Sequence, residues 1–248
     1  MQLSSNINRV LAETADAERV LDVGGAHRPL NTATHTLDAL PYSDRGPVLF
    51  RDVPERFSEA NWLQFDMCER PWPYPDKHFD FSFCAGTLED VRDPIGACYE
   101  LMRVSRAGYI ETPSRLCEIF HERRGYWFRR IIGRKFAVGW GHHRWFCELE
   151  GDTVTFLAKT LTSVASRKFF ITRAELGRGL TEAEIAIGLF WTDRFTAREW
   201  LLIKPGETEA ELARFKKETL RRLRSADAAE RAGRIQSEAA PGPRGAGA

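Results

Sequence analysis

The sequence lacks the features that mark several classes of protein. Its formal net charge is only +1, so no global field favours binding to nucleic acid or to an anionic membrane. No apolar run approaches the roughly 18 residues that a membrane span requires. The N-terminal segment MQLSSNINRVLAETADAERV mixes charged and polar residues and lacks the apolar stretch of a signal peptide. We therefore expect no membrane association, with the cytoplasm as the compartment.

The cysteines also form no recognisable motif. The five cysteines stand at positions 68, 84, 98, 117 and 147, which makes them odd in number, widely spaced and free of CxxC pairs. This pattern predicts neither a disulfide framework nor a thiolate zinc site. The 248 residues, of which 43% are hydrophobic and 29% charged, are those of an ordinary globular chain with one large domain or one domain and a cap.

What the sequence does have is an alternation of strand-like and helical segments. A polar helix is expected over residues 4–18 and a second helix from Asp93 to Gly108, where apolar residues recur at helical spacing. The expected strands cover residues 19–23, 34–38, 63–66, 79–84 and 109–112. Such alternation predicts a mostly parallel sheet with helices on both faces.

Two glycines directly follow the first expected strand, in the stretch RVLDVGGAHRPL. In an open α/β sheet, ligands bind beyond the carboxyl ends of the strands. Gly24 and Gly25 would let the backbone approach a ligand, and a helix expected after them would offer free N–H groups. The order of these features predicts a nucleotide-like cofactor over the two glycines.

Acidic residues end the next two strands. Asp38, at the end of the second strand, is placed to accept hydrogen bonds from the two hydroxyls of a ribose. Asp66 ends the third strand and is placed to bond an adenine amino group, and Met67 follows it and would cover the adenine ring.

Three further motifs follow in order: PWPYPDKHFD at 71–80, TLEDVRDP at 87–94 and ELMRV at 100–104. Together with the glycine turn, they resemble the class I S-adenosylmethionine-dependent methyltransferases, and among these the small-molecule, methyltransferase type 11-like group. The resemblance covers residues 19–113. It implies a Rossmann-like, mostly parallel seven-stranded sheet with helices on both faces and a substrate-side insertion. It also implies that S-adenosylmethionine is the cofactor, bound by Asp22, Gly24, Gly25, Asp38, Asp66, Met67 and Cys84.

On this basis the chain divides into three parts. Residues 1–113 form the cofactor-binding Rossmann-like half, and residues 114–206 form the substrate-side insertion and the C-terminal strands. Residues 207–248 form a charged helix, expected over 207–234, and a flexible tail. Within the second part, residues 144–160 predict a β-hairpin with its turn at Gly151.

The motifs depart from the family pattern at three positions. Ala26 and Arg28 stand where the family usually has its second and third glycines, and Asp90 stands where the family has the histidine of LEH. These departures keep open an alternative, which is a methyltransferase-like binding or scaffold protein that has lost turnover.

The expected reaction is methyl transfer to an oxygen or nitrogen of a small metabolite, such as a saccharide or a natural product. The catalytic candidates are Glu89, His142 and His143, because a hydroxyl nucleophile must lose a proton and imidazole titrates near neutrality. We predict no metal site. Two adjacent histidines cannot face the same way on a strand, and no carboxylate lies at helical ligand spacing from them.

Other functions and ligands are alternatives to this expectation. A dinucleotide-binding oxidoreductase would need a third glycine where the chain has Pro29, and it would not explain the stretch at 71–80. The basic and aromatic stretch at 115–146 is of the kind that binds single-stranded nucleic acid, but a charged face around buried aromatics is the more ordinary explanation, and an RNA-modifying methyltransferase is disfavoured. The same arginines leave an anionic acceptor open. The sequence does not indicate an oligomeric state.

Overall fold

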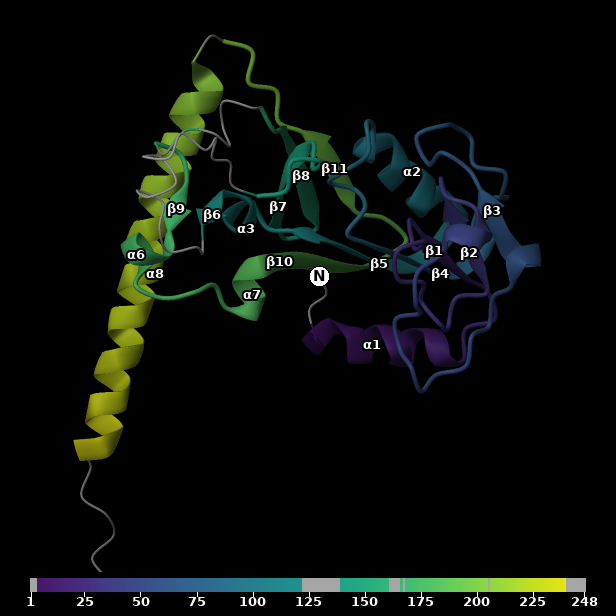
Figure 1. Cartoon of the computed structure of the whole chain (residues 1–248), viewed down its shortest axis with the longest axis horizontal. Helices are drawn as coiled ribbons and strands as arrows, with labels where there is room; N and C mark the ends of the chain where they lie inside the picture. Colours follow the sequence, from purple (N-terminus) through teal and green to yellow (C-terminus); the bar gives the residue numbers. More distant parts are fainter. Residues whose placement is uncertain (1–3, 122–138, 161–165, 167, 205, 240–248) are drawn as a thin grey trace, which may run out of the picture.

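The computed structural model describes residues 4–121, 139–160, 166, 168–204 and 206–239 (Figure 1). None of the described helices is both long and apolar enough to cross a bilayer.

A six-stranded sheet lies at the centre of the mixed α/β fold. Its strands are β1 (Val20–Val23), β2 (His35–Asp38), β3 (Trp62–Gln64), β4 (Phe79–Ala85), β5 (Ser105–Pro113) and β10 (Ala186–Thr192). They are ordered β10-β5-β4-β1-β2-β3, and every neighbouring pair is parallel except β10 with β5. This order, with the first strand beside the fourth, is that of a Rossmann-like sheet.

The mostly parallel sheet is confirmed, but the sheet has six strands among the described residues rather than seven. One helix covers each face of it. Val10 of α1 (Ser4–Ala15) lies in a core cluster with Val20 and Phe81, whereas Leu101 of α2 (Pro94–Val104) lies in a second cluster with Leu21. Neighbouring residues of β1 therefore point to opposite faces, as a strand requires.

The start of α2 follows directly from its sequence. Asp93 is the N-cap, its side chain accepts a hydrogen bond from Gly96 N, and Pro94 fills the first helical position. The expected end at Gly108 is wrong. The helix ends at Val104 and β5 begins at once, so Gly108 lies inside the strand, where a Cβ would press on the backbone oxygen of Ser82.

No helix follows the glycine turn, contrary to expectation. Residues 24–34 form turns only, and the chain returns to the sheet at His35. The reason is local: Asp22 Oδ2 accepts a hydrogen bond from Leu30 N at 2.8 Å, which folds the loop back onto the end of β1, and Pro29 restricts the chain just before it. The carboxyl end of β1 is therefore followed by a loop rather than by a helix N-terminus.

A second sheet has the order β11-β8-β7, with β7 (Trp145–Glu150), β8 (Thr153–Ala158) and β11 (Thr196–Glu199). The predicted hairpin is confirmed, because β7 and β8 are antiparallel and Gly151 makes the turn with a φ of 60°. Val154 and Phe156 join the core cluster of α2, so this sheet covers the same face of the central sheet as α2 does. Two short strands, β6 (Phe120–His121) and β9 (Ile171–Thr172), pair separately.

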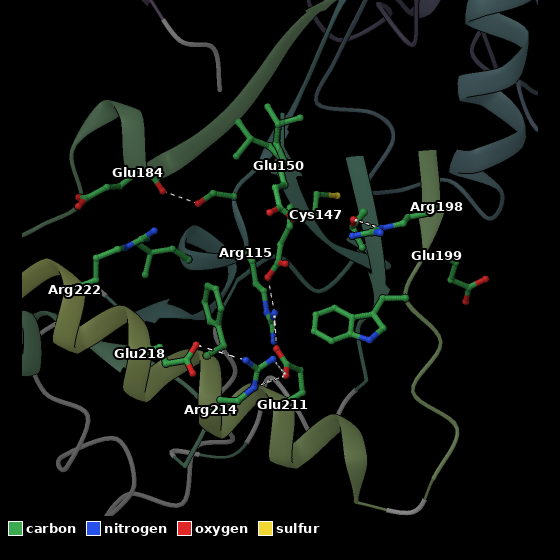
Figure 2. Close-up of a pocket in the computed structure, with 18 of the residues that line it drawn as sticks. Arg115, Cys147, Glu150, Glu184, Arg198, Glu199, Glu211, Arg214, Glu218 and Arg222 are labelled. Atoms are coloured by element: carbon green, nitrogen blue, oxygen red, sulfur yellow. Dashed lines mark hydrogen bonds and ion pairs between the residues drawn. The ribbon is translucent and has the colours of Figure 1, made fainter. Parts of the chain in front are cut away.

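The charged C-terminal segment forms α8 (Glu207–Ala239), which runs along the edge of the molecule in Figure 1 and is longer than predicted. Its Leu212 and Leu223 pack in a third core cluster with Phe170 and other apolar residues. Arg115, at the start of α3 (Arg115–Ile119), points toward Glu211 of α8, with 3.2 Å between Nη1 and Oε1 (Figure 2). The other described helices are the short α6 (Arg173–Leu176) and α7 (Glu182–Ile185) and the 3-10 helices η1 (Tyr42–Asp44) and η2 (Glu59–Asn61).

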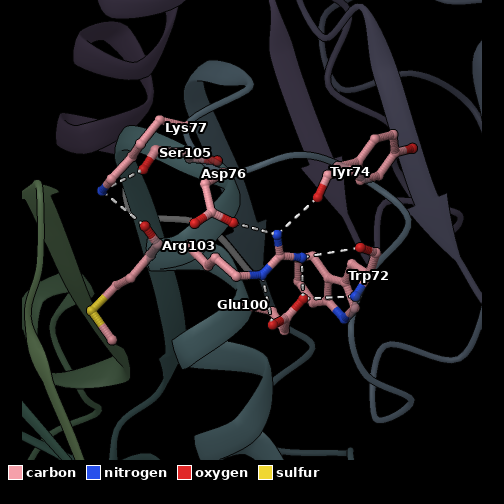
Figure 3. Close-up of polar contacts among 8 residues, drawn as sticks. Trp72, Tyr74, Asp76, Lys77, Glu100, Arg103 and Ser105 are labelled. Atoms are coloured by element: carbon pink, nitrogen blue, oxygen red, sulfur yellow. Dashed lines mark hydrogen bonds and ion pairs between the residues drawn. The ribbon is translucent and has the colours of Figure 1, made fainter.

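The proline-rich stretch at 71–80 is held to α2 by one arginine. Arg103 donates to the carbonyl oxygens of Trp72 and Tyr74 at 3.0 and 2.8 Å, and it pairs with Glu100 and Asp76 (Figure 3). Trp72 in turn donates through Nε1 to the carbonyl oxygen of Met67 at 2.9 Å. The ELMRV and PWPYPDKHFD motifs thus have a structural role, which is to fix the loop that carries Met67.

Candidate functional site

A cavity of about 710 Å³ opens at the carboxyl end of the parallel strands. We call it the strand-end cavity. It brings together seven of the ten residues predicted for the site, namely Gly24, Asp38, Asp66, Met67, Glu89, His142 and His143. They come from the ends of β1, β2, β3 and β4 and from the loop before β7.

Gly24 lines this cavity in a conformation that favours glycine. Its φ is 75°, and a Cβ placed on it would overlap the side chain of Thr87. Its N–H donates to Leu37 O at 2.9 Å, which keeps the turn against β2.

Asp38 stands at the next strand end and is 7% exposed. Its Oδ2 accepts from Ala26 N and its Oδ1 accepts from Leu40 N, both at 2.8 Å. Each oxygen can accept a further bond. The carboxylate is thereby fixed in the cavity wall and also braces the glycine turn.

Asp66 and Met67 lie in the same wall, where Asp66 is ion-paired and Met67 is apolar and buried. Asp66 pairs with Arg92, with 2.5 Å between Oδ2 and Nη1, and accepts from Cys68 N at 2.8 Å. The Cys68 amide lowers the pKa of the Asp66 carboxyl most, and the Arg92 guanidinium lowers it further. Met67 is 6% exposed and presents an apolar surface to the cavity.

Three predicted cofactor residues do not line the cavity. Cys84, which is expected to line the cavity, is instead fully buried in the core of the sheet. Burial also raises the pKa of its thiol. Gly25 packs against Asp22, whose carboxylate a Cβ would overlap. Asp22 lies behind the turn at 1% exposure, and burial raises the pKa of its carboxyl to about 7, with a smaller contribution from Asp38.

Arg28 is exposed and is not among the residues that line the cavity. Its place in the third glycine position therefore does not fill the cavity with a guanidinium.

Glu89 lies just beyond β4 and is 2% exposed. Burial raises the pKa of its carboxyl to about 7, and His143 acts weakly in the opposite direction. Its Oε2 is buried and has no hydrogen-bond partner among the described residues, although the residue lines the cavity.

His142 and His143 lie in a turn before β7 rather than on a strand. His143 is 9% exposed, and its Nδ1 lies 2.6 Å from Glu118 Oε1. Because a carboxylate only accepts, Nδ1 is the donor and Nε2 is left toward the cavity side, where Asp90 Oδ1 lies 3.8 Å away. Glu118 also accepts from Lys159, whose Nζ donates to Trp140 O at 2.7 Å.

Several of these neighbours carry no local signal in the sequence. Glu118 is 25 residues from His143, and Lys159 is 41 residues from Glu118. Asp90 is visible in the sequence as a departure from LEH, but nothing there places it beside the histidines. Because His142 and His143 lie in a turn rather than on a strand, the strand alternation expected to turn the two side chains apart does not apply to them.

The described wall of the strand-end cavity is acidic. Its five carboxylic acids have no lysine or arginine among the other described lining residues; they are Asp38, Asp66, Glu89, Asp90 and Glu111. Such a wall favours ligands that carry positive charge and disfavours anions.

A second cavity, of about 830 Å³, lies between α8 and the second sheet (Figure 2). We call it the α8 cavity. Four arginines face six glutamates in its wall; they are Arg115, Arg198, Arg214 and Arg222 with Glu148, Glu150, Glu184, Glu199, Glu211 and Glu218. Most of the basic stretch expected to hold an anionic acceptor, residues 122–138, lies outside the described residues.

Comparisons with known proteins give distant likenesses. No family model matches the chain, and no curated protein does. Among solved structures, the chain is similar to the [4+2]-cyclase SpnF at 18% identity and a TM-score of 0.31, over 44% of each chain. It is similar to an S-adenosylmethionine-dependent methyltransferase from Mesorhizobium loti at 14% identity and a TM-score of 0.30, over 46% of this chain and 55% of that one.

The N-terminal domain of EvdMO1, solved in the presence of SAH and D-fucose, is similar over 77% of this chain and 66% of that one, at 14% identity and a TM-score of 0.34. The chain spans about half the length of the SpnF and Mesorhizobium loti structures. Each of these TM-scores lies below 0.5, so the function of this chain has to be inferred from its own residues.

Proposed function

We propose that the chain is an S-adenosylmethionine-dependent methyltransferase that acts on an oxygen or nitrogen of a small metabolite. One observation carries the proposal. The strand-end cavity collects Gly24, Asp38 and Met67 from three consecutive strand ends, in the order that the sequence motifs imply, and adds Glu89 and the two histidines to the same wall.

The residues present fit this cofactor. The positive φ of Gly24 and the absence of a Cβ there leave room at the end of β1, and the volume of about 710 Å³ is within the range of small-molecule sites. S-adenosylmethionine carries a net positive charge through its sulfonium and ammonium groups. The acidic wall favours that charge.

When bound, the cofactor would supply an electrophilic methyl group. The chain itself would mainly orient the reactants and exclude water. Asp38 would hold the ribose hydroxyls, and Met67 would cover the adenine ring. Asp66 would reach the adenine amino group only through the oxygens that Arg92 and Cys68 already share. Asp22, Gly25 and Cys84 would act from behind the wall, by shaping the turn and the strand end.

On the acceptor side, Glu89, His142 and His143 are the residues that we propose to act on the substrate, because they line the same cavity. The five acids of the wall favour a neutral or cationic acceptor over an anionic one. A sugar hydroxyl or a natural-product amine is suitable, and no nucleic acid or membrane is required.

A binding or scaffold protein without turnover is the second candidate. It is favoured by the loop at 24–34, which offers no helix N-terminus to the cofactor, and by the ion pair that occupies Asp66.

Calorimetric titration with S-adenosylmethionine and with its demethylated product tests the proposal. We expect saturable binding of both, with one site per chain, and unchanged affinity in the control Arg28→Ala. Absence of binding at millimolar ligand would contradict the methyltransferase and favour a scaffold protein. Binding without release of the demethylated product, over a panel of hydroxyl and amine acceptors, would favour the second.

A further inference from the structure

We propose that Asp90, His142 and His143 form a binding site for a divalent transition-metal ion in the wall of the strand-end cavity. Each residue offers one ligand atom, and these atoms lie within 4.8 Å of one another. Two imidazoles and a carboxylate are a ligand set that suits zinc and neighbouring first-row metals better than magnesium. We call these three residues the histidine cluster.

The surroundings of His143 are those of a metal ligand. A ligating histidine usually donates its other ring N–H to a carboxylate, which fixes the ring and its tautomer. Glu118 does this for His143 at 2.6 Å and is itself held by Lys159. Trp140 stacks on the His143 ring, with 5.1 Å between the ring centroids. The ring therefore has one orientation, with Nε2 toward Asp90.

The backbone brings the two parts of the histidine cluster together. Arg144 N and Trp145 N both donate to Glu89 O, at 2.7 and 3.2 Å. These bonds tie the segment after the histidines to the residue before Asp90. In the turn, the rings of His142 and His143 lie 4.6 Å apart and nearly perpendicular, so both can face one ion.

An independent observation points to a cation at this place. Asp90 Oδ1 and Glu89 Oε2 are buried oxygens without a hydrogen-bond partner among the described residues, and Glu89 is 2% exposed. Buried polar atoms are nearly always paired, with protein, water or an ion. The described wall offers them no lysine or arginine, and a bound cation would compensate these groups.

The role of this metal site in the reaction rests on the proposed function. Three protein ligands leave coordination positions open, and a hydroxyl or carbonyl oxygen of the acceptor would occupy one of them. His142 and His143 would then orient the acceptor through the ion. Binding of the ion itself does not depend on S-adenosylmethionine.

The test is calorimetry on the full chain after treatment with a chelator, with Zn²⁺ as the probe and Mg²⁺ as the comparison. We expect one equivalent of Zn²⁺ to bind and Mg²⁺ to bind much more weakly. His142→Ala, at an exposed position, and Asp90→Asn, which keeps the side-chain shape, should each weaken Zn²⁺ binding by about 100-fold or more. Glu118→Gln should weaken it by about 10–100-fold.

His27→Ala is the matched control, because His27 is exposed and lines the same cavity outside the histidine cluster. It should keep the affinity of the wild type. Circular dichroism would verify that each variant is folded. Lack of saturable Zn²⁺ binding by the folded wild type, or equal binding by the wild type, His142→Ala and Asp90→Asn, would overturn the inference.

A parallel titration with the demethylated cofactor separates this inference from the proposed function. Zn²⁺ binding without cofactor binding would keep the metal site and refute the methyltransferase. Cofactor binding without Zn²⁺ binding would have the opposite meaning.

Discussion

The strand-end cavity and the α8 cavity are similar in size and are both rich in acidic side chains, but they differ in how those acids are compensated. In the α8 cavity, Arg115 pairs with Glu148 and Glu211, and Arg214 pairs with Glu211 and Glu218. In the strand-end cavity, the described wall has no arginine or lysine. In the α8 cavity, compensated charge joins α8 to the body of the protein. In the strand-end cavity, Arg92, the partner of Asp66, is not a lining residue, and we propose that the acidic wall binds a cationic ligand.

Two pKa values illustrate the difference between a carboxyl that is buried and one that is paired with an arginine. Near the strand-end cavity, burial raises the pKa of Asp22 to about 7. In the wall of the α8 cavity, hydrogen bonds from Arg178 lower the pKa of Glu184 to about 2. The first carboxyl is destabilised as an anion in the folded protein, and the second is stabilised.

The largest effect is expected from removal of the buried cation of the α8 cavity. Arg115→Ala would leave the buried carboxylate of Glu211 without this partner and remove the guanidinium from the Phe215 ring, which it overlies at 4.1 Å. We expect a loss of about 3–5 kcal/mol in the free energy of unfolding, measured by urea denaturation. Cofactor affinity of the folded fraction should not change. Arg198→Ala, an exposed residue of the same wall, should cost far less; equal losses would contradict the role given to Arg115.

The next effect is a pH dependence. The folded-state pKa of Asp22, about 7, lies above its ordinary value of 3.8. The folded protein therefore binds more protons than the unfolded chain between these values, and the contribution of Asp22 is complete below pH 4 and lost as pH rises through about 7. The loss is on the order of 4 kcal/mol. Asp22→Asn keeps an acceptor for Leu30 N and should remove this part of the pH dependence, whereas the exposed Asp16→Asn should not.

Asp38 tests the ligand side of the comparison. Asp38→Asn keeps the shape of the side chain but removes its charge, so cofactor affinity should fall by about one to two orders of magnitude, or roughly 1.5–3 kcal/mol. The alanine variant is less suitable, because it would also remove the acceptors of Ala26 N and Leu40 N. Unchanged affinity in calorimetry of a folded Asp38→Asn protein would place the ribose elsewhere.

A smaller effect is expected at Gly139. Its φ is 67°, and a Cβ there would collide with the side chain and the carbonyl oxygen of Glu118. Gly139→Ala should cost about 1–3 kcal/mol of stability and should weaken Zn²⁺ binding, because Glu118 orients His143. Gly141→Ala, where a Cβ meets nothing within 4 Å, is the matched control. Equal behaviour of the two variants in thermal denaturation and calorimetry would contradict this account.

The smallest effect is expected with nucleic acid. Arg115, the first arginine of the basic stretch, is committed to Glu148 and Glu211. We expect no tight binding to single-stranded RNA at physiological ionic strength, as measured by fluorescence anisotropy. Sub-micromolar binding with a steep salt dependence would show that the strand-end cavity is not the main ligand site.

The sequence predicted those parts of the molecule whose causes are local. The alternating strands, the Asp93 cap of α2 and the Gly151 hairpin follow from neighbouring residues, and all three are confirmed. The missing helix after Gly25 also has a local cause, because the hydrogen bond from Leu30 N to Asp22 and the ring of Pro29 fold the chain back toward β1. The expectation of a helix there followed the usual α/β pattern instead of these two residues.

The histidine cluster could not be predicted in this way. His143 is fixed by Glu118 and Lys159, which are distant in sequence and belong to different elements. The relation between Asp90 and the histidines depends on backbone bonds to Glu89 O that form only in the folded chain. The likeness to LEH identified the position of Asp90 but not its neighbours.

The most direct test of the comparison is a crystal structure of the chain with the demethylated product of S-adenosylmethionine. We predict that the ligand lies in the strand-end cavity, with its ribose hydroxyls on Asp38 and its adenine against Met67, and that the α8 cavity holds none. A ligand in the α8 cavity, or one in the strand-end cavity whose ribose lies away from Asp38, would contradict the account.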